Sequence, residues 1–335
     1  MAMCLANGLH WEGVRFPEFD PSILDGLITW YDFADHTFIE KSSGTLVTFG
    51  ITSQDLYQID NKWDSVSNLP NVFPIDINGN NSNGYFLGSS LRSEGSNTIP
   101  DWKNPSGLVG GGYNSRYVDF TGVYNLGGGT NNGSRRLKGD GTSSTESISL
   151  DNFTFYIVFK QDVASPTSPD GGKQNLVWVN GIKSSSDDES RLITLTKSGG
   201  GASGGGRYFL SLYVDGSLEA NISAGSYTVD TSTKILGFIV NSSDTDTSIG
   251  RLYQSGDATY EDTSENGVAT TMKGGEGAVS GDNMCYIGSK GADVSAADPD
   301  NSFDGRMLEI VMYNRAIGTG EQSELETYFK TKWNI

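Results

Sequence analysis

Apolar residues recur along most of the chain in short runs of the length and period expected for β-strands. The clearest run lies at 153–159, where Phe153, Phe155, Ile157 and Phe159 form one strongly apolar face at period two. Similar runs lie at 26–35, 175–180, 191–196, 207–214, 234–240 and 283–288, separated by polar, glycine-rich stretches. No helical pattern of useful length interrupts this series, so the pattern predicts antiparallel sheets and not a parallel β-α-β architecture.

The C-terminal end combines one more strand with a short helix. In the strand at 305–314, Leu308, Ile310 and Met312 are predicted to share one face, and Glu309 stands on the other, apart from the innermost core. Thr319 and Gln322 have the spacing of a capping box and predict the helix start. Four apolar residues recur at helical spacing and predict the face that docks on the sheets: Leu325, Tyr328, Phe329 and Trp333.

Two regions show neither the period of a strand nor that of a helix. Residues 1–20 carry scattered aromatics and prolines and are predicted to form an arm that packs on this chain or on a neighbouring subunit. The stretch at about 60–115 is rich in Asn, Gly, Pro and Ser and is predicted to be a loop-rich insertion. Because a long unstructured loop is uncommon in a compact domain, we expect it either to contain short strands or to serve in binding. The expected fold is therefore all-β, a two-sheet antiparallel sandwich over 21–335 with one short C-terminal helix.

Charge and composition limit the classes of molecule that the chain is expected to bind. The formal net charge is −18, which disfavours binding to nucleic acid and to anionic membrane surfaces. No run approaches 18 apolar residues and the N-terminus lacks the pattern of a secretory signal, so we expect synthesis in a cytoplasm without membrane insertion. Cys4 and Cys285 are far apart in sequence and are interpreted as free thiols.

The segment from Phe303 to Trp333 resembles the closing segment of the laminin-G-like and concanavalin-like jelly-roll domains. In that family a Phe-Asp-Gly turn leads into the last strand, then into a Tyr-Asn-Arg-Ala turn and a short helix, and all these pieces occur here in order. The segments YVDFTG at 117–122, FTFYIVFKQ at 153–161 and YIGSKG at 286–291 fit the same template more loosely. The resemblance covers about 150–335 and implies a jelly-roll sandwich of the concanavalin type.

The run GLITWYDFAD at 26–35 resembles the opening strand of such domains on bacteriophage structural proteins and bacterial surface proteins. This resemblance implies a virion component of the capsid or tail, which would contact other virion proteins and associate with itself. Two alternatives stay open: a carbohydrate-binding module that recognises a cell-surface glycan, and a glycoside hydrolase. Aromatic residues near loop-rich sequence could stack on sugars, although core packing is the default for each: Trp63, Tyr85, Trp102, Tyr113 and Tyr117.

Catalytic residues are not expected. A retaining glycosidase needs two neighbouring carboxylates, whereas Glu309 stands alone on its strand. The acidic groups at 187–189 and at Asp257, Glu261 and Asp262 lie in loop-like sequence, where solvated loops are the default. His10 lies in the predicted arm and His36 in a turn. Neither can be assigned to a Ser/His/Asp triad, because no serine has a nucleophile-elbow sequence around it. We therefore expect a protein that is not an enzyme.

Calcium is the one cofactor that the sequence suggests. The stretch DVSAADPDNSFDG offers oxygen ligands at Asp298, Asp300, Asn301 and Asp304, with Asp293 nearby. Jelly-roll lectin-like domains often carry calcium in comparable loops, so the resemblance also implies a calcium site here. The spacing does not match an EF-hand, and Asp and Asn are equally the residues that turns prefer.

Overall fold

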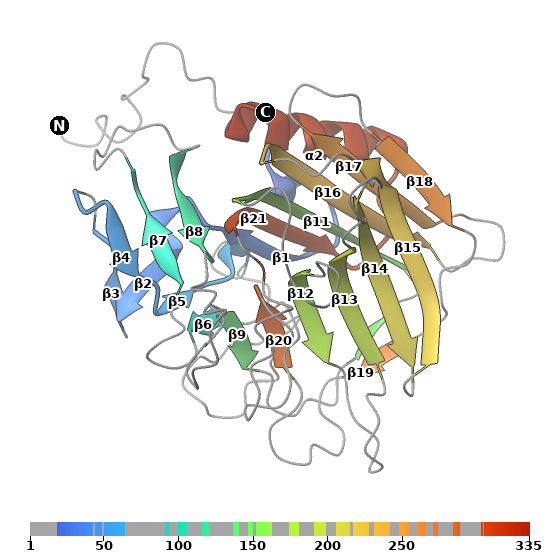
Figure 1. Cartoon of the computed structure of the whole chain (residues 1–335), viewed down its shortest axis with the longest axis horizontal. Helices are drawn as coiled ribbons and strands as arrows, with labels where there is room; N and C mark the ends of the chain where they lie inside the picture. Colours follow the sequence, from blue (N-terminus) through green and yellow to red (C-terminus); the bar gives the residue numbers. More distant parts are fainter. Residues whose placement is uncertain are drawn as a thin grey trace.

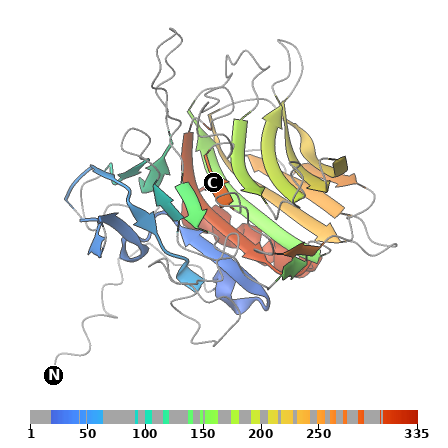
Figure 2. The same ribbon diagram turned by 90° about the horizontal axis from the view of Figure 1, so that it is seen from below.

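The computed structural model of the chain describes the following residues: 19–42, 44–48, 50–63, 91–93, 100–105, 115–120, 137–140, 147–149, 152–162, 174–180, 191–198, 206–214, 217–227, 231–241, 248–254, 260–264, 271–273, 284–288, 303 and 305–335. They form two large β-sheets stacked face to face, with one α-helix on the outer face of one sheet (Figures 1 and 2). The predicted two-sheet antiparallel sandwich with a C-terminal helix is confirmed.

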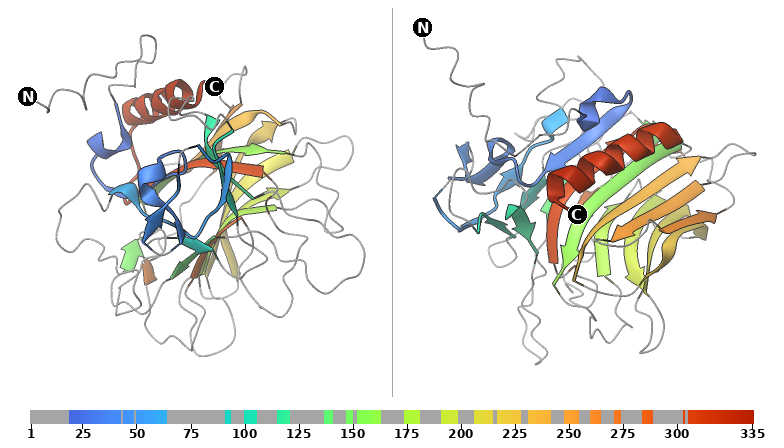
Figure 3. Two further views of the ribbon diagram at one scale, coloured as in Figure 1. Left: turned by 90° about the vertical axis from the view of Figure 1, so that its left-hand side faces the viewer. Right: turned by 90° about the horizontal axis from the view of Figure 1, so that it is seen from above.

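The sheet that carries the helix is called the helix-side sheet. Its strands, in spatial order, are β18 (Tyr260–Ser264), β17 (Ser248–Gln254), β16 (Thr233–Asn241), β11 (Asn152–Gln161), β21 (Gly305–Tyr313), β8 (Tyr117–Asp119), β7 (Asp101–Lys103) and β4 (Ser53–Asp55). Strand β1 (Leu27–Asp32) also pairs with β21, beside β8. The helix itself is α2 (Thr319–Trp333), and it lies across the outer face of this sheet (Figure 3).

The second sheet is called the distal sheet. Its order is β15 (Ser217–Tyr227), β14 (Gly206–Val214), β13 (Arg191–Ser198), β12 (Gln174–Asn180), β20 (Met284–Ile287), β9 (Leu137–Asp140), β6 (Leu91–Ser93), β5 (Gln58–Ile59), β2 (Ile39–Ser42) and β3 (Thr45–Leu46). A separate pair joins β10 (Ser147–Ser149) to β19 (Thr271–Lys273), and two short 3-10 helices, η1 (Pro21–Ile23) and η2 (His36–Phe38), flank β1. Every strand pair among the described residues is antiparallel.

Two apolar clusters hold these layers together, and β11 contributes to both. The predicted face of Phe153, Phe155, Ile157 and Phe159 lies in the core between the sheets. The opposite face, with Tyr156 and Val158, packs under α2. Because both faces of β11 are covered, its sequence is a nearly continuous apolar run, as is usual for a strand buried on both sides. The four predicted contact residues of α2 are buried in the second cluster, as expected.

A β-bulge in β21 corrects the predicted faces of that strand. Val158 pairs with Glu309 and Phe159 pairs with Met307, so Leu308 is the extra residue of the bulge. Met307 therefore joins the core between the sheets, and Leu308 joins the helix-side cluster, the reverse of the alternation predicted. Glu309 lies on the face away from the core between the sheets, as predicted, but it is fully buried there on the helix side.

The start of α2 also differs from the prediction by one residue. The N-cap is Gly318, and the side chain of Glu321 accepts a hydrogen bond from its backbone N–H at 2.8 Å. Glu321, and not Gln322, thus makes the back-bond of a capping arrangement, with no side chain at the cap position to reciprocate. Arg315 donates to both oxygens of Glu321 and ties the strand-to-helix turn to the first helical turn.

A close approach fixes one glycine beneath the helix. A Cβ added to Gly237 on β16 would overlap the ring of Tyr156 on the neighbouring strand. The Tyr156 hydroxyl donates to Glu326 of α2 at 3.2 Å, and Arg251 of β17 pairs with the same carboxylate at 2.6 Å. The absent side chain of Gly237 therefore leaves room for a ring that links the sheet to the helix.

Several strands were not predicted. Glu261 and Asp262, expected in a loop, lie in β18. Strand β17 lies in a stretch with weak alternation, and β15 was missed although Leu218, Ala220, Ile222 and Ala224 recur in it at period two. Within the predicted insertion the structure describes β6 and β7, while most of the rest of 60–115, like residues 1–18, lies outside the described residues. At the end of the arm, Phe19 makes an edge-on ring contact with Tyr328 at 6.2 Å.

Candidate functional site

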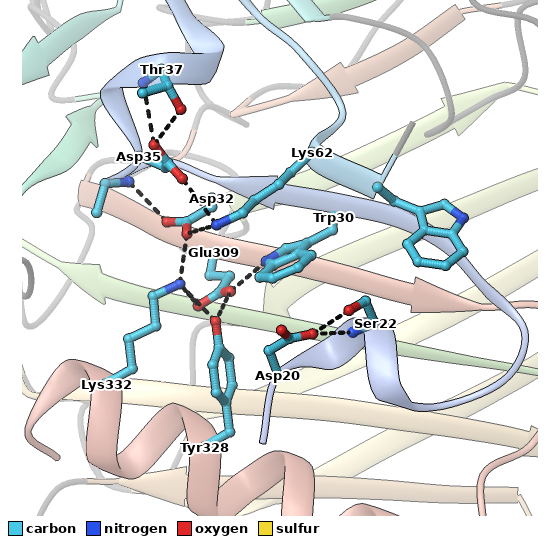
Figure 4. A network of polar contacts seen from close by, with 12 residues as sticks. Asp20, Ser22, Trp30, Asp32, Asp35, Thr37, Lys62, Glu309, Tyr328 and Lys332 are labelled. Carbon is cyan, nitrogen blue, oxygen red and sulfur yellow. Dashed lines mark hydrogen bonds and ion pairs between the residues drawn. The ribbon is translucent and has the colours of Figure 1, made fainter. Parts of the chain in front are cut away.

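A network of polar contacts lies between the helix-side sheet and α2 (Figure 4). It contains five charged side chains, here called the buried charge cluster: Asp32, Asp35, Lys62, Glu309 and Lys332. Asp32 and Glu309 project from the paired strands β1 and β21, and Lys332 reaches down from the last turn of α2. Lys62 comes from the segment that follows β5, so the cluster joins parts of the chain that are far apart in sequence.

Glu309 accepts four contacts from donors that surround its carboxylate. Its Oε1 accepts from Trp30 Nε1 at 2.6 Å and from the Tyr328 hydroxyl at 2.8 Å. Its Oε2 accepts from Trp333 Nε1 at 2.8 Å and pairs with Lys332 Nζ at 2.8 Å. Burial raises the pKa of Glu309 above its ordinary value, and the attraction of Lys332 opposes this shift without cancelling it.

The remaining members of the cluster continue the chain of ion pairs. Lys332 Nζ lies 2.9 Å from Asp32 Oδ2, and Lys62 Nζ lies 3.2 Å from the same oxygen and 2.9 Å from Asp35 Oδ2. Burial acts to lower the pKa of Lys62, but the two aspartates outweigh it and raise that pKa. Lys62 also lies 4.3 Å from the centroid of the Trp30 ring, which adds a cation–π contact.

The cluster contains a pair of carboxylates that sequence reasoning missed. Asp32 lies directly opposite Glu309 in the β1–β21 register, and one ammonium, that of Lys332, bridges both. Neighbouring carboxylates are what a retaining glycosidase requires, but such a pair must also face a substrate. Here Asp32 is 1% exposed and Glu309 0% exposed, and α2 lies over them. This geometry fastens the helix to the sheet and offers a sugar no contact with either carboxylate while α2 stays in place.

A second polar group lies on the part of the same outer face that carries β7 and β8. It is called the β7–β8 patch and consists of Asp101, Lys103, Tyr117, Asp119 and Arg306. Lys103 Nζ lies 2.9 Å from the carboxylate of Asp101 and 4.0 Å from that of Asp119, which oppose each other in register. The Arg306 guanidinium lies 4.6 Å from the centroid of the half-buried Tyr117 ring. Burial raises the pKa of Tyr117.

The predicted calcium ligands Asp298, Asp300, Asn301 and Asp304 lie outside the described residues, so the calcium site stays a prediction. In the part of the chain that the structure describes, no group of three or more His, Cys, Asp or Glu side chains could hold a metal. None of the helices in that part is long and apolar enough to span a membrane.

The aromatic candidates separate into core and surface positions. Trp102 is fully buried, and its Nε1 donates to the carbonyl of Phe33 at 3.1 Å, whereas Trp63 and Tyr117 are half-buried beside the helix-side cluster. Tyr85 and Tyr113 lie outside the described residues. His36 begins η2 and lies in a turn as predicted; burial lowers its pKa.

No family model matches the chain, and no curated protein matches it. Solved structures that resemble it include a heptameric pentraxin of Limulus polyphemus, which has 14% identity and a TM-score of 0.37 over 64% of this chain and 80% of that one. A sialidase module of family CBM40 from Ruminococcus gnavus, bound to α2,3-sialyllactose, has 14% identity and a TM-score of 0.34 over 55% of this chain and 95% of that one. An arabinofuranosidase complexed with arabinofuranosyl-α-1,2-xylobiose has 10% identity and a TM-score of 0.42 over 92% of this chain and 60% of that one. Similarities at this level decide neither ligand nor activity.

Proposed function

We propose that the protein is a non-enzymatic structural protein of a bacteriophage particle, placed in the capsid or tail and built on the β-sandwich as a rigid scaffold. The observation that carries the non-enzymatic part is the state of Asp32 and Glu309. These carboxylates oppose each other on paired strands, as a catalytic pair would, but both are buried under α2 and bridged by Lys332.

The assignment to a phage particle rests on the resemblance of 26–35 to the opening strand of jelly-roll domains on bacteriophage structural proteins and bacterial surface proteins. The ordered scaffold supports a structural role, because a particle protein must present its surfaces in fixed positions. The buried charge cluster and the two apolar clusters hold sheet, helix and the segment after β5 in one arrangement.

Particle fractionation tests this proposal. Virus particles purified by density gradient from a lysate of the host that carries the gene are analysed by quantitative mass spectrometry. The proposal predicts that the chain co-purifies at a fixed ratio to the major capsid protein and stays bound after a high-salt wash. Recovery of the chain only in the soluble fraction, with none in the particles, would overturn the structural role.

A second candidate, carbohydrate binding, is favoured by the β7–β8 patch. There a half-buried tyrosine ring lies among side chains that can donate to and accept from sugar hydroxyls. A glycan array probed with the wild-type protein, with Lys103→Gln and with Lys41→Gln tests it. Lys41 is the control. Like Lys103, which bonds to Ser53 at 2.8 Å, it makes an exposed hydrogen bond, to Thr48 at 3.0 Å, but it lies on β2 of the other sheet. Binding that Lys103→Gln weakens and Lys41→Gln preserves would establish this function; an array without a bound glycan would exclude it.

A further inference from the structure

Three side chains of the buried charge cluster carry the groups that form an amide bond. The Nζ of Lys332 lies 2.9 Å from Oδ2 of Asp32 and 2.8 Å from Oε2 of Glu309, and it donates to the Tyr328 hydroxyl at 2.8 Å (Figure 4). One amine therefore contacts a carboxyl group that it can attack and a second carboxylate that can take its proton. An amide forms when an amine nitrogen joins a carboxyl carbon with loss of water.

The surroundings of these groups exclude water. The side chains of Lys332, Asp32 and Glu309 are 8%, 1% and 0% exposed. Three aromatic rings lie with their centroids 5.0 to 6.0 Å from the Lys332 nitrogen: Trp333, Tyr328 and Trp30. A dry site disfavours charged groups, so transfer of a proton from Lys332 to Glu309, which leaves two neutral groups, costs less here than in water. Burial already raises the pKa of Glu309.

Hydrogen-bond donors hold the carboxyl group of Asp32. Its Oδ1 accepts from the backbone N–H of Ala34 at 3.2 Å, and its Oδ2 lies 3.2 Å from Lys62 Nζ. Such donors stabilise the negative charge of a tetrahedral intermediate. Because a C–O bond is about 1.2 Å long, Lys332 Nζ lies at most about 4 Å from the carboxyl carbon of Asp32, near the roughly 3 to 3.5 Å of a reactive arrangement. Groups held in this way react as if at effective concentrations of about 10⁵ M or more.

Lys332, and not Lys62, is the amine of this set. Both ammonium groups contact Oδ2 of Asp32, but the side chain of Lys62 is 19% exposed and also pairs with Asp35. Although burial acts to lower the pKa of Lys62, the two aspartates raise it and hold this group as an ammonium, which is not a nucleophile. Lys332 instead contacts Glu309, which can accept its proton.

We propose that Lys332 and Asp32 condense to an intramolecular isopeptide bond, with Glu309 as the general base. Glu309 takes one proton from the ammonium, and rotation about the Cε–Nζ bond turns the freed lone pair toward Cγ of Asp32. The Nζ–Cγ bond forms. Oδ2 then receives the proton from Glu309 and a second proton from the nitrogen, and the Cγ–Oδ2 bond breaks to release water. Ammonium and carboxylate thus become amide and water, Glu309 returns to a carboxylate, and no further reactant is consumed.

The bond joins β1 to the last turn of α2. It closes residues 32–332 into one covalent ring, so unfolding cannot separate the helix from the first strand of the sheet. The reaction occurs once in each chain and concerns the fold itself. The inference therefore does not rest on the proposed role in a particle, and its failure would leave that proposal unchanged.

Intact-mass spectrometry of the denatured full chain tests the proposal. The wild type should be lighter than the unlinked chain by the mass of one water. A tryptic digest should contain peptide 16–41, which includes Asp32, joined through Lys332 to peptide 331–335, since trypsin does not cleave after an acylated lysine. Lys332→Arg keeps the positive charge but has no nucleophilic amine, so it should have the full mass. Lys330→Arg, the matched control on the same helix, should lose water like the wild type.

Glu309→Gln tests the base. Gln has nearly the same shape but cannot accept the proton, so in freshly synthesised protein sampled over time the bond should form at least about 100-fold more slowly. Circular dichroism shows which variants are folded. The wild-type mass and the linked peptide decide the existence of the bond even where a variant does not fold.

A wild type with the full mass and no linked peptide would overturn the proposal. A loss of water that persists in Lys332→Arg would also overturn it, because it would indicate a succinimide at an Asp-Gly sequence such as Asp25-Gly26. A folded Glu309→Gln protein that forms the bond as fast as the wild type would overturn the assignment of the base to Glu309.

Discussion

Replacing Lys332 with Met removes the ammonium that bridges the two buried carboxylates and keeps most of the volume of the side chain. In the wild type this ammonium lies 2.9 Å from Asp32 and 2.8 Å from Glu309. In Lys332→Met both carboxylates remain buried and oppose each other across β1 and β21 without the cation they share. We therefore expect a large loss of stability, and not a change confined to the end of the helix.

The expected size follows from the burial of the carboxylates. Removing one partner of a buried ion pair typically costs about 3 to 5 kcal/mol, because it leaves an uncompensated charge. With an entropy of unfolding of about 2 cal/mol/K per residue, this cost lowers the Tm of a chain of this length by roughly 4 to 7 °C. Lys330→Met is the matched control on the same helix. Lys330 lies 3.8 Å from the centroid of the Tyr253 ring, a cation–π contact whose loss costs about 0.5 to 1 kcal/mol.

The measurement is urea denaturation and thermal melting of both variants at several pH values. Burial already raises the pKa of Glu309 in the folded protein. A carboxyl whose folded pKa is raised gives its full stability below its ordinary pKa and loses stability as pH rises through the folded value. Without Lys332 this effect grows, so the cost of Lys332→Met should be smaller near about pH 5 than at about pH 8. A cost no larger than that of Lys330→Met, with no dependence on pH, would refute the reasoning.

Three further predictions follow from other features of the fold. Gly237→Ala places a Cβ against the ring beneath the helix and should cost about 1 to 3 kcal/mol in urea denaturation. Gly320→Ala is its control: it meets nothing within 4 Å and should be neutral or slightly stabilising. Burial raises the pKa of Tyr313, and neighbouring carboxylates raise that of Lys62. The stability that each of these side chains contributes is therefore complete below about pH 10 and is lost at higher pH. Thermal melts should show this loss in the alkaline range, and a Tm that stays constant through it would contradict the assignment. Calcium binding by the predicted loop requires that millimolar CaCl₂ raise the Tm and that Asp300→Asn abolish the rise; an equal Tm with CaCl₂ and with EDTA would remove calcium from the account.

The sequence was sufficient for the parts of the fold that depend on local pattern. The alternation in 153–159 identified a strand, and the spacing of Leu325, Tyr328, Phe329 and Trp333 identified the docking face of α2. These signals are local, because a face is defined by residues close together in the chain. The bulge at Leu308 was not predicted, since an extra residue in one strand is defined only by the pairing with its partner.

The buried charge cluster was missed for a related reason. Lys332 was not recognised as a partner of Glu309, which was described as standing alone on its strand. Asp32 becomes its neighbour only through the pairing of β1 with β21, which brings together residues at opposite ends of the chain. One signal was available: Glu309 and Lys332 are charged residues inside otherwise apolar buried patterns, and buried charges are usually paired.

The central claim is that the carboxylate pair under α2 is structural and that the protein does not hydrolyse glycans. The most direct test measures hydrolysis of a panel of polysaccharides and aryl glycosides by the wild type and by Glu309→Gln, alongside the free energy of unfolding of both. The account predicts no hydrolysis above buffer with either protein, and a lower free energy of unfolding for Glu309→Gln. Hydrolysis by the wild type that disappears in a folded Glu309→Gln variant would contradict it.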